Sequence, residues 1–158
     1  MPRKAGPPSQ GSSSRWRRAR KGGEEIRKLG HEFGATTGTE RRCGWIDLPA
    51  LKYAIMINGV TELSMMKADV LDSFKEIYVC THYVQQGEQI DYFPFELNEN
   101  TKPVFKKVSG WNQDITKCKK EKDFPKELSS YIEYLEKELE VPISIVSVGP
   151  NRTETIIR

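Results

Sequence analysis

Three short loops in the sequence carry residue types that bind small charged ligands. The first, residues 34–42, reads Gly-Ala-Thr-Thr-Gly-Thr-Glu-Arg-Arg. Glycines let the backbone approach a ligand, threonines offer hydroxyl groups, and arginines bind a carboxylate or phosphate with two parallel hydrogen bonds. An ordinary glycine turn followed by solvated arginines has the same composition, so the residues alone leave both interpretations open.

The second loop is Lys67-Ala68-Asp69, which follows a predicted strand. In this arrangement an aspartate accepts two hydrogen bonds from the ring N–H and the exocyclic amine of guanine, while the lysine stem packs on the base. Adenine presents no such pair of donors, and an unpaired buried carboxylate is costly, so an aspartate discriminates between the two bases. The alternative is a helix-start aspartate beside a surface lysine, with Asp72 as a possible helix N-cap.

The third loop is Ser147-Val148-Gly149-Pro150, at the end of the most apolar strand of the chain. Ligands of open α/β sheets collect at the carboxyl ends of strands. A serine and a glycine there can offer backbone N–H groups to a base carbonyl. A simple strand-ending turn has the same residues, so this loop is also open to a structural interpretation.

The elements that must position these loops alternate between helices and strands, which predicts an α/β fold. Apolar spacing predicts helices, and runs of β-branched and aromatic residues predict strands. The helices are expected at residues 24–32, 46–58 and 123–139, and the strands at 62–66, 76–84, 89–92, 104–108 and 143–148, with a hairpin turn at 86–88.

The strand at residues 143–148 is almost wholly apolar, as in strands buried on both faces of a parallel sheet. Only four other strands are predicted, all of them short or peripheral, and two of them form a peripheral hairpin. We therefore expect a partial mixed or parallel sheet with flanking helices and a peripheral β-hairpin, and a missing partner segment.

The first 23 residues are rich in Pro, Gly and Ser and are predicted to be a disordered basic tail, leaving one domain at residues 24–158. Residues 1–21 hold seven basic residues and no acidic one, so the other 18 basic and 22 acidic residues give residues 22–158 a net charge of −4. RNA or a membrane surface could bind such a tail, but a solvated tail is the simpler interpretation, and we expect no nucleic-acid or membrane partner.

The three cysteines are far apart in the sequence, and the two histidines do not form a zinc-binding spacing with them. We expect reduced thiols in the cytoplasm. No apolar run approaches the roughly 18 residues that a membrane helix needs.

Taken together and in order, these loops resemble the adenylosuccinate synthetase family over about residues 24–158. The resemblance depends on several runs, each found in this chain: Glu32-Phe-Gly-Ala-Thr-Thr-Gly, Arg41-Arg-Cys-Gly-Trp-Ile-Asp, Lys67-Ala-Asp-Val-Leu-Asp, Asp91-Tyr-Phe-Pro, Gly110-Trp, Tyr131-Ile-Glu-Tyr and Ile145-Val-Ser-Val-Gly-Pro.

The resemblance implies an enzyme that joins IMP and L-aspartate with GTP and Mg²⁺, as a homodimer, in the step toward AMP. The residues that it implies for aspartate and IMP are Ala35, Thr36, Thr37, Gly38, Thr39, Glu40 and Arg41. The residues that it implies for GTP are Arg41, Lys67, Ala68, Asp69, Ser147, Val148 and Gly149.

Two departures from the family pattern matter. Thr39 stands where the family usually has an arginine, and losing a charge-assisted contact costs about 1.5–3 kcal/mol. The sequence also has no Gly-Asp-Glu-Gly-Lys-Gly run, and neither His31 nor His82 lies in the context of the family's catalytic histidine. No catalytic residue and no Mg²⁺ ligand is therefore assigned.

We expect a C-terminal portion of a synthetase, either a truncated or mis-started reading frame or a genuinely shortened paralogue, that is inactive alone. The alternatives are a non-catalytic binding or regulatory paralogue that pairs with a full-length synthetase, or an unstable chain that aggregates through an exposed strand edge.

Overall fold

A computed structural model describes residues 14–158, with side chains from residue 22 onward; most of the predicted tail lies outside the described side chains. The elements are α1 (Ser14–Leu29), β1 (Ile46–Asp47), α2 (Leu48–Asn58), β2 (Leu63–Met65), η1 (Ala68–Leu71), β3 (Glu76–Gln85), β4 (Glu88–Ile90), β5 (Thr101–Ser109), η2 (Glu121–Asp123), α3 (Lys126–Leu139), β6 (Ile143–Ser147), η3 (Arg152–Glu154) and β7 (Thr155–Ile157).

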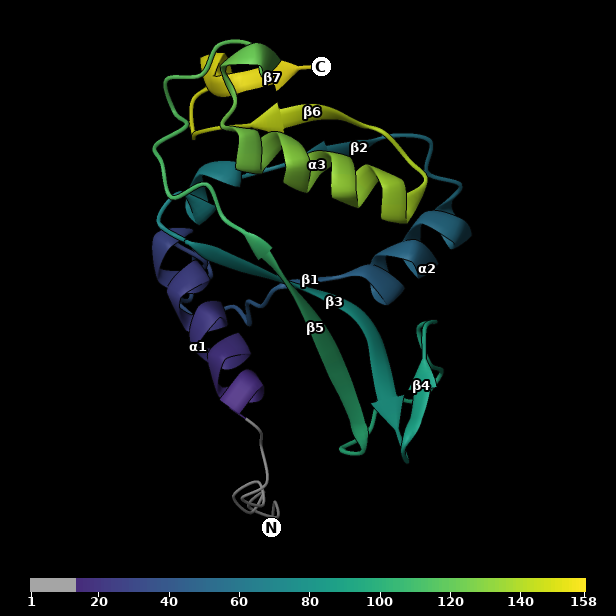
Figure 1. Cartoon of the computed structure of the whole chain (residues 1–158). Coiled ribbons are helices and arrows are strands. Elements are labelled where there is room, and N and C mark those ends of the chain that lie inside the picture. Colours follow the sequence, from purple (N-terminus) through teal and green to yellow (C-terminus); the bar gives the residue numbers. More distant parts are fainter. Residues whose placement is uncertain (1–13) are drawn as a thin grey trace.

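The strands form two sheets rather than one (Figure 1). In the first, β3 is the central strand, antiparallel to β5 along its length and to β4 at its end, and parallel to the short β1. In the second, β6 lies between β2, which is parallel to it, and β7, which is antiparallel. The prediction of a mixed α/β fold is confirmed.

The strand at residues 143–148 has a neighbour on each side within the described chain, β2 and β7. β7 was not predicted, because Thr155–Ile157 is a three-residue strand directly after a turn, and it supplies the second neighbour. Arg158 then fixes the end of the described chain, since its guanidinium donates to Glu136 at 2.6 Å and to the carbonyl of Ile143 at 2.7 Å.

The hairpin between β3 and β4 is confirmed. Gln86 and Gly87 both have positive φ, 54° and 91°, which is the pair of conformations that a two-residue type I′ turn requires. β4 lies at the edge of the sheet, whereas β3 runs through its centre with Ile77 and Val79 fully buried.

Helix α2 ends at the predicted residue, but it begins at Leu48 rather than Ile46, because Ile46 and Asp47 form β1. The Asp47 carboxylate caps it by accepting the N–H of Ala50 at 3.1 Å, and Gly59 ends it with a left-handed φ of 60°. The OH of Tyr83 in β3 donates to the same carboxylate at 2.7 Å, so the cap also joins α2 to the first sheet.

Helix α3 connects the two sheets. It buries one face, as its apolar spacing predicts, and contacts β5 of the first sheet and β6 of the second, where Glu136 accepts the N–H of Ile143 at 2.7 Å. Its buried residues are Leu128, Tyr131, Ile132, Leu135 and Leu139.

Helix α1 differs from the expectation of a helix at residues 24–32. It begins at Ser14 and ends at Leu29, so residues 14–23, predicted as part of the tail, are helical, while residues 1–13 lie outside the described residues. Gly22 and Gly23 allow this helix to pack closely, because an added Cβ would lie 2.4 Å from the Trp45 ring or 2.3 Å from the Cys43 carbonyl oxygen.

Candidate functional site

Two of the predicted loops lie at the same edge of the second sheet. β2 and β6 run parallel, with Met65 paired to Val146, so residues 67–69, which follow β2, and residues 147–149, where β6 ends, lie at the same end of the sheet. The short helix η1, which contains Asp69, packs against β6. The structure thus places these loops as ligand-binding loops of α/β sheets are placed.

Asp69 has an unusual environment within this edge. Its Oδ1 atom is shielded from solvent and has no hydrogen-bond partner among the described residues. A buried carboxylate oxygen without a donor is costly, and a ligand that donated to it would remove that cost. The alternative, a helix-start aspartate beside a surface lysine, also describes these positions, because Asp69 lies in the first turn of η1 and the Lys67 side chain is 54% exposed. It leaves the unpartnered Oδ1 unexplained.

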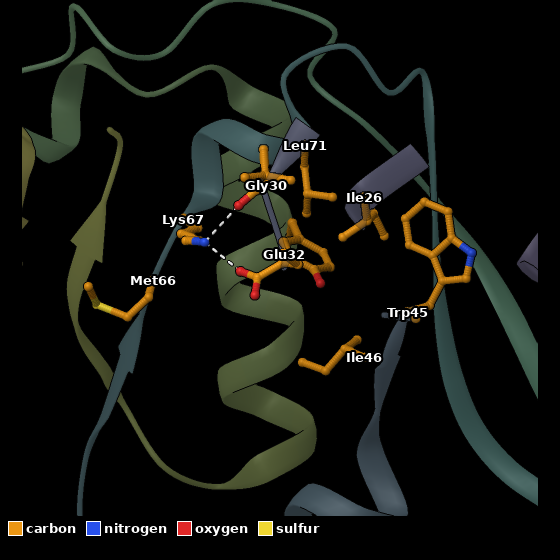
Figure 2. Close-up of a pocket in the computed structure, with 11 residues that line it drawn as sticks. Ile26, Gly30, Glu32, Trp45, Ile46, Met66, Lys67 and Leu71 are labelled. Atoms are coloured by element: carbon orange, nitrogen blue, oxygen red, sulfur yellow. Dashed lines mark hydrogen bonds and ion pairs between the residues drawn. The ribbon is translucent and has the colours of Figure 1, made fainter. Parts of the chain in front are cut away.

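Lys67 adopts a left-handed backbone conformation, with φ of 57° and ψ of 41°. Few residues other than glycine adopt it, and here the side chain is held in place by two contacts (Figure 2). Its Nζ donates to the carbonyl oxygen of Gly30 at 2.9 Å and forms an ion pair with the carboxylate of Glu32.

The loop after β6 is closed by its own polar groups. The buried Ser147 hydroxyl donates to the Gly149 carbonyl at 3.0 Å, and the N–H of Val148 donates to the Glu154 carbonyl at 2.8 Å. A Cβ at Gly149 would lie 2.3 Å from a carboxylate oxygen of Glu154, so glycine leaves room for this side chain to approach the loop. The Val148 N–H is therefore already used within the protein.

The threonine-rich loop is a small hairpin closed by an antiparallel bridge between Phe33 and Glu40. The N–H of Gly34 donates to the carbonyl of Thr39 at 2.8 Å, and Gly38 has a left-handed φ of 64°. The Thr39 hydroxyl donates to the Thr37 hydroxyl at 2.8 Å. All seven residues 35–41 are exposed, so the loop is ordered by internal bonds and open to a ligand.

Glu40 is paired with a cation of helix α1. Arg27 of α1 donates to its carboxylate at 2.8 Å and, through Nε, to the carbonyl of Arg41 at 2.6 Å. Arg27 was not predicted as part of the site, because its partners are 13 and 14 residues away in sequence and only the packing of α1 brings them together.

Arg41 and Lys67 meet at one carboxylate. Arg41 Nη1 lies 2.9 Å from Glu32 Oε2, and Lys67 Nζ contacts Oε1 of the same residue. The hydrogen bond from Lys67, and to a smaller extent the one from Arg41, holds the pKa of Glu32 below its usual range. The first two predicted loops are thus joined by a residue to which the sequence had assigned no role, although it opens one of the quoted runs.

A cavity of about 280 Å³ lies beside Lys67 and Glu32, between α1, η1 and β1 (Figure 2). Its walls are mostly apolar, with Ile26, Ile46 and Leu71 among them. Asp69 and residues 147–149 do not line it, so the cavity is not the space to which Asp69 belongs.

The comparisons with known proteins agree with this geometry. Residues 9–156 match the family model described as adenylosuccinate synthetase. The chain belongs to the adenylosuccinate synthetase family. Adenylosuccinate synthetases from Phocaeicola vulgatus and Bacteroides fragilis are 57% and 54% identical to it over 136 and 138 residues, which is 86% and 87% of this chain but 32% and 33% of those proteins.

The fold comparison gives the same result. A solved structure of fully ligated adenylosuccinate synthetase from Plasmodium falciparum superposes with a TM-score of 0.82 at 36% identity. The match covers 87% of this chain and 34% of that one, so the chain spans about a third of the length of the synthetases that it matches.

The cysteines and the membrane prediction can also be compared with the structure. Cys43, Cys80 and Cys118 are free thiols, as expected, and burial raises the pKa of Cys80 to about 12, which keeps that thiol protonated.

Within the described part of the chain, no helix is long and apolar enough to cross a membrane.

Proposed function

We propose that this chain forms the guanine- and aspartate-recognising part of an adenylosuccinate synthetase, which joins IMP and L-aspartate at the expense of GTP. The observation that carries the proposal is the buried, unpartnered Oδ1 of Asp69 at the carboxyl end of β2. Guanine offers a ring N–H and an exocyclic amine to such a carboxylate, and adenine does not.

In the proposed guanine site, Asp69 accepts from the edge of the base and the Lys67 stem packs on its face. Ala68 is almost fully buried and fixes the backbone between them. Ser147, Val148 and Gly149 border the site from the neighbouring strand. Because the N–H of Val148 is already bonded to Glu154, we expect the remaining backbone N–H groups of this loop to meet the base carbonyl.

The proposed aspartate site is the exposed threonine-rich loop, residues 35–41. Thr36 and Thr37 offer hydroxyl and backbone donors to the carboxylates of L-aspartate, with Arg41 as the cation and Gly38 providing the turn. Thr39 uses its hydroxyl on Thr37, so it does not replace the charge of the family's arginine. The Glu40 charge is offset by Arg27, which lowers the repulsion of an anionic ligand.

No catalytic residue is assigned to this chain. For the family's Mg²⁺ no ligand is assigned in this chain, and the described side chains include no group of three His, Cys, Asp or Glu that could hold a metal ion. We therefore derive no step through Mg²⁺. We further propose a cytoplasmic location and, for the complete enzyme, a homodimer without nucleic-acid partners.

Binding of GTP to the 158-residue chain should be weak. Most of the binding energy of a nucleotide comes from its phosphates, held by backbone N–H groups and cations, and the chain has no Gly-Asp-Glu-Gly-Lys-Gly run to supply them. Calorimetry should show no tight binding, and a sub-micromolar Kd would contradict this division of roles.

Base recognition can be tested on the same chain by ¹⁵N NMR titration with GDP and, in parallel, ADP. We expect GDP to shift the amides of residues 67–69 and 147–149 at millimolar concentration, with ADP shifting them less. Equal shifts with both nucleotides, or shifts elsewhere only, would show that these loops do not select guanine.

A further inference from the structure

One carboxylate, that of Glu32, joins the two loops assigned to different ligands. Its Oε1 contacts Lys67, 35 residues away in sequence, and its Oε2 contacts Arg41, nine residues away. The Glu32 side chain is 21% exposed, whereas the Lys67 and Arg41 side chains are 54% and 59% exposed. Glu32 is thus the least exposed member of the cluster, and it contacts both of the more exposed cations.

The contacts of Lys67 do more than balance charge. A lysine with φ of 57° has a backbone conformation that residues with a Cβ seldom adopt, and it directly precedes the helix that carries Asp69. Its Nζ is bonded both to Glu32 and to the Gly30 carbonyl at 2.9 Å. These two bonds fix the direction of the lysine stem, and with it the start of η1.

The two acidic residues near the threonine-rich loop, Glu32 and Glu40, each pair with a different arginine. Arg27 forms an ion pair with Glu40 at 2.8 Å, and Arg41 forms one with Glu32 at 2.9 Å. Adjacent residues of the threonine-rich loop are therefore tied to two different elements: Glu40 to α1, and Arg41 to the turn that follows α1. Glu32, the partner of Arg41, also contacts Lys67, so Arg41 is linked to residues 67–69, the proposed guanine loop.

We propose that Glu32 is a positioning residue of the proposed guanine site. This inference rests on the proposed function. Glu32 holds Lys67 in the conformation that presents Asp69 Oδ1 to the base edge, and it sets the distance between the guanine loop and the threonine-rich loop through Arg41. It does not contact the base itself.

The experiment compares Glu32→Gln with Glu121→Gln in the 158-residue chain. Glu121 is a matched control, because its carboxylate forms a surface ion pair with Arg158 at 2.7 Å, in a different part of the fold from Lys67. Affinities for GDP and ADP are measured by NMR titration. The ratio of the two dissociation constants is the readout, since a change in charge near the phosphates affects both nucleotides alike and cancels in the ratio.

Glu32→Gln should lower the preference for GDP over ADP by about three- to fivefold, the size of a lost ion-pair interaction, while Glu121→Gln leaves it unchanged. An unchanged preference in a folded Glu32→Gln variant would overturn the inference and leave the proposed function intact. If the wild-type chain shows no preference for GDP, both fail.

Should Glu32→Gln not fold, Glu32→Asp provides the second test. It keeps the charge but shortens the side chain by one methylene, so it cannot reach both Lys67 and Arg41 as glutamate does. An intermediate preference for GDP supports the inference, and a wild-type preference contradicts it.

Discussion

Asp72 accepts the indole N–H of Trp111 at 2.7 Å, and its second oxygen accepts the backbone N–H of Ile115 at 3.1 Å. The sequence had offered Asp72 as a possible helix N-cap, but it follows η1 instead and ties the end of η1 to the segment after β5. Trp111 and Ile115 are both buried, so this carboxylate anchors the end of the loop to the core.

Replacing Asp72 with Ala should therefore destabilise the chain. It would leave the Trp111 N–H and the Ile115 N–H without an acceptor, at a cost of about 1–3 kcal/mol in the free energy of unfolding. Urea unfolding followed by Trp fluorescence measures the change. Asp91→Ala, at an exposed position, is the control, and an equal loss in both variants would contradict the anchoring role.

Acidification should weaken the fold partly through Asp123. The N–H groups of Lys119 and Lys120 each donate to its carboxylate at 3.0 Å and lower its pKa from the usual 3.8. A lowered pKa means that the stabilisation is complete above the unfolded value and is lost as pH falls through the folded one.

Urea unfolding from pH 6 down to pH 2 should show this loss below about pH 4. Asp123→Asn should flatten that part of the curve, because an amide does not titrate. Glu99→Gln, at an exposed loop position, serves as the comparison and should leave the slope unchanged. A curve for Asp123→Asn as steep as the wild type would exclude this role.

Gly110, in the Gly-Trp run, is expected to be sterically required. A Cβ there would lie 2.0 Å from the carbonyl oxygen of Phe74, a backbone atom that a side-chain rotation cannot move away. Gly110→Ala should cost about 1–3 kcal/mol in unfolding free energy. At Gly44 a Cβ would meet nothing within 4 Å, so Gly44→Ala should change stability by less than about 1 kcal/mol. Thermal unfolding of both variants decides between these outcomes.

Local sequence signals predicted most of the fold. The apolar spacing of residues 46–58 marked α2 to within two residues, and Gln86-Gly87 marked a turn that needs two positive φ angles. Such signals operate between residues that are close in sequence. The strand-end position of Lys67-Ala68-Asp69 was predicted in the same way, from an apolar run followed by polar residues.

What the sequence could not supply depends on tertiary packing. β7 has only three residues and exists because β6 offers it an edge. The start of α1 at Ser14 was not predicted, because Gly22 and Gly23 are typical of loops rather than helices. In the structure these glycines let the helix pack closely against Cys43 and Trp45. The role of Glu32 needs partners 9 and 35 residues away, a pairing that no local pattern encodes.

Guanine recognition by Asp69 is tested most directly by Asp69→Asn titrated with GDP and xanthosine 5′-diphosphate. Xanthine carries a carbonyl oxygen where guanine has its amine, so it pairs with the amide of asparagine and not with a carboxylate. The wild-type chain should prefer GDP, and the folded variant should prefer xanthosine 5′-diphosphate, by about tenfold in each case. A variant that keeps the wild-type preference for GDP would contradict the account.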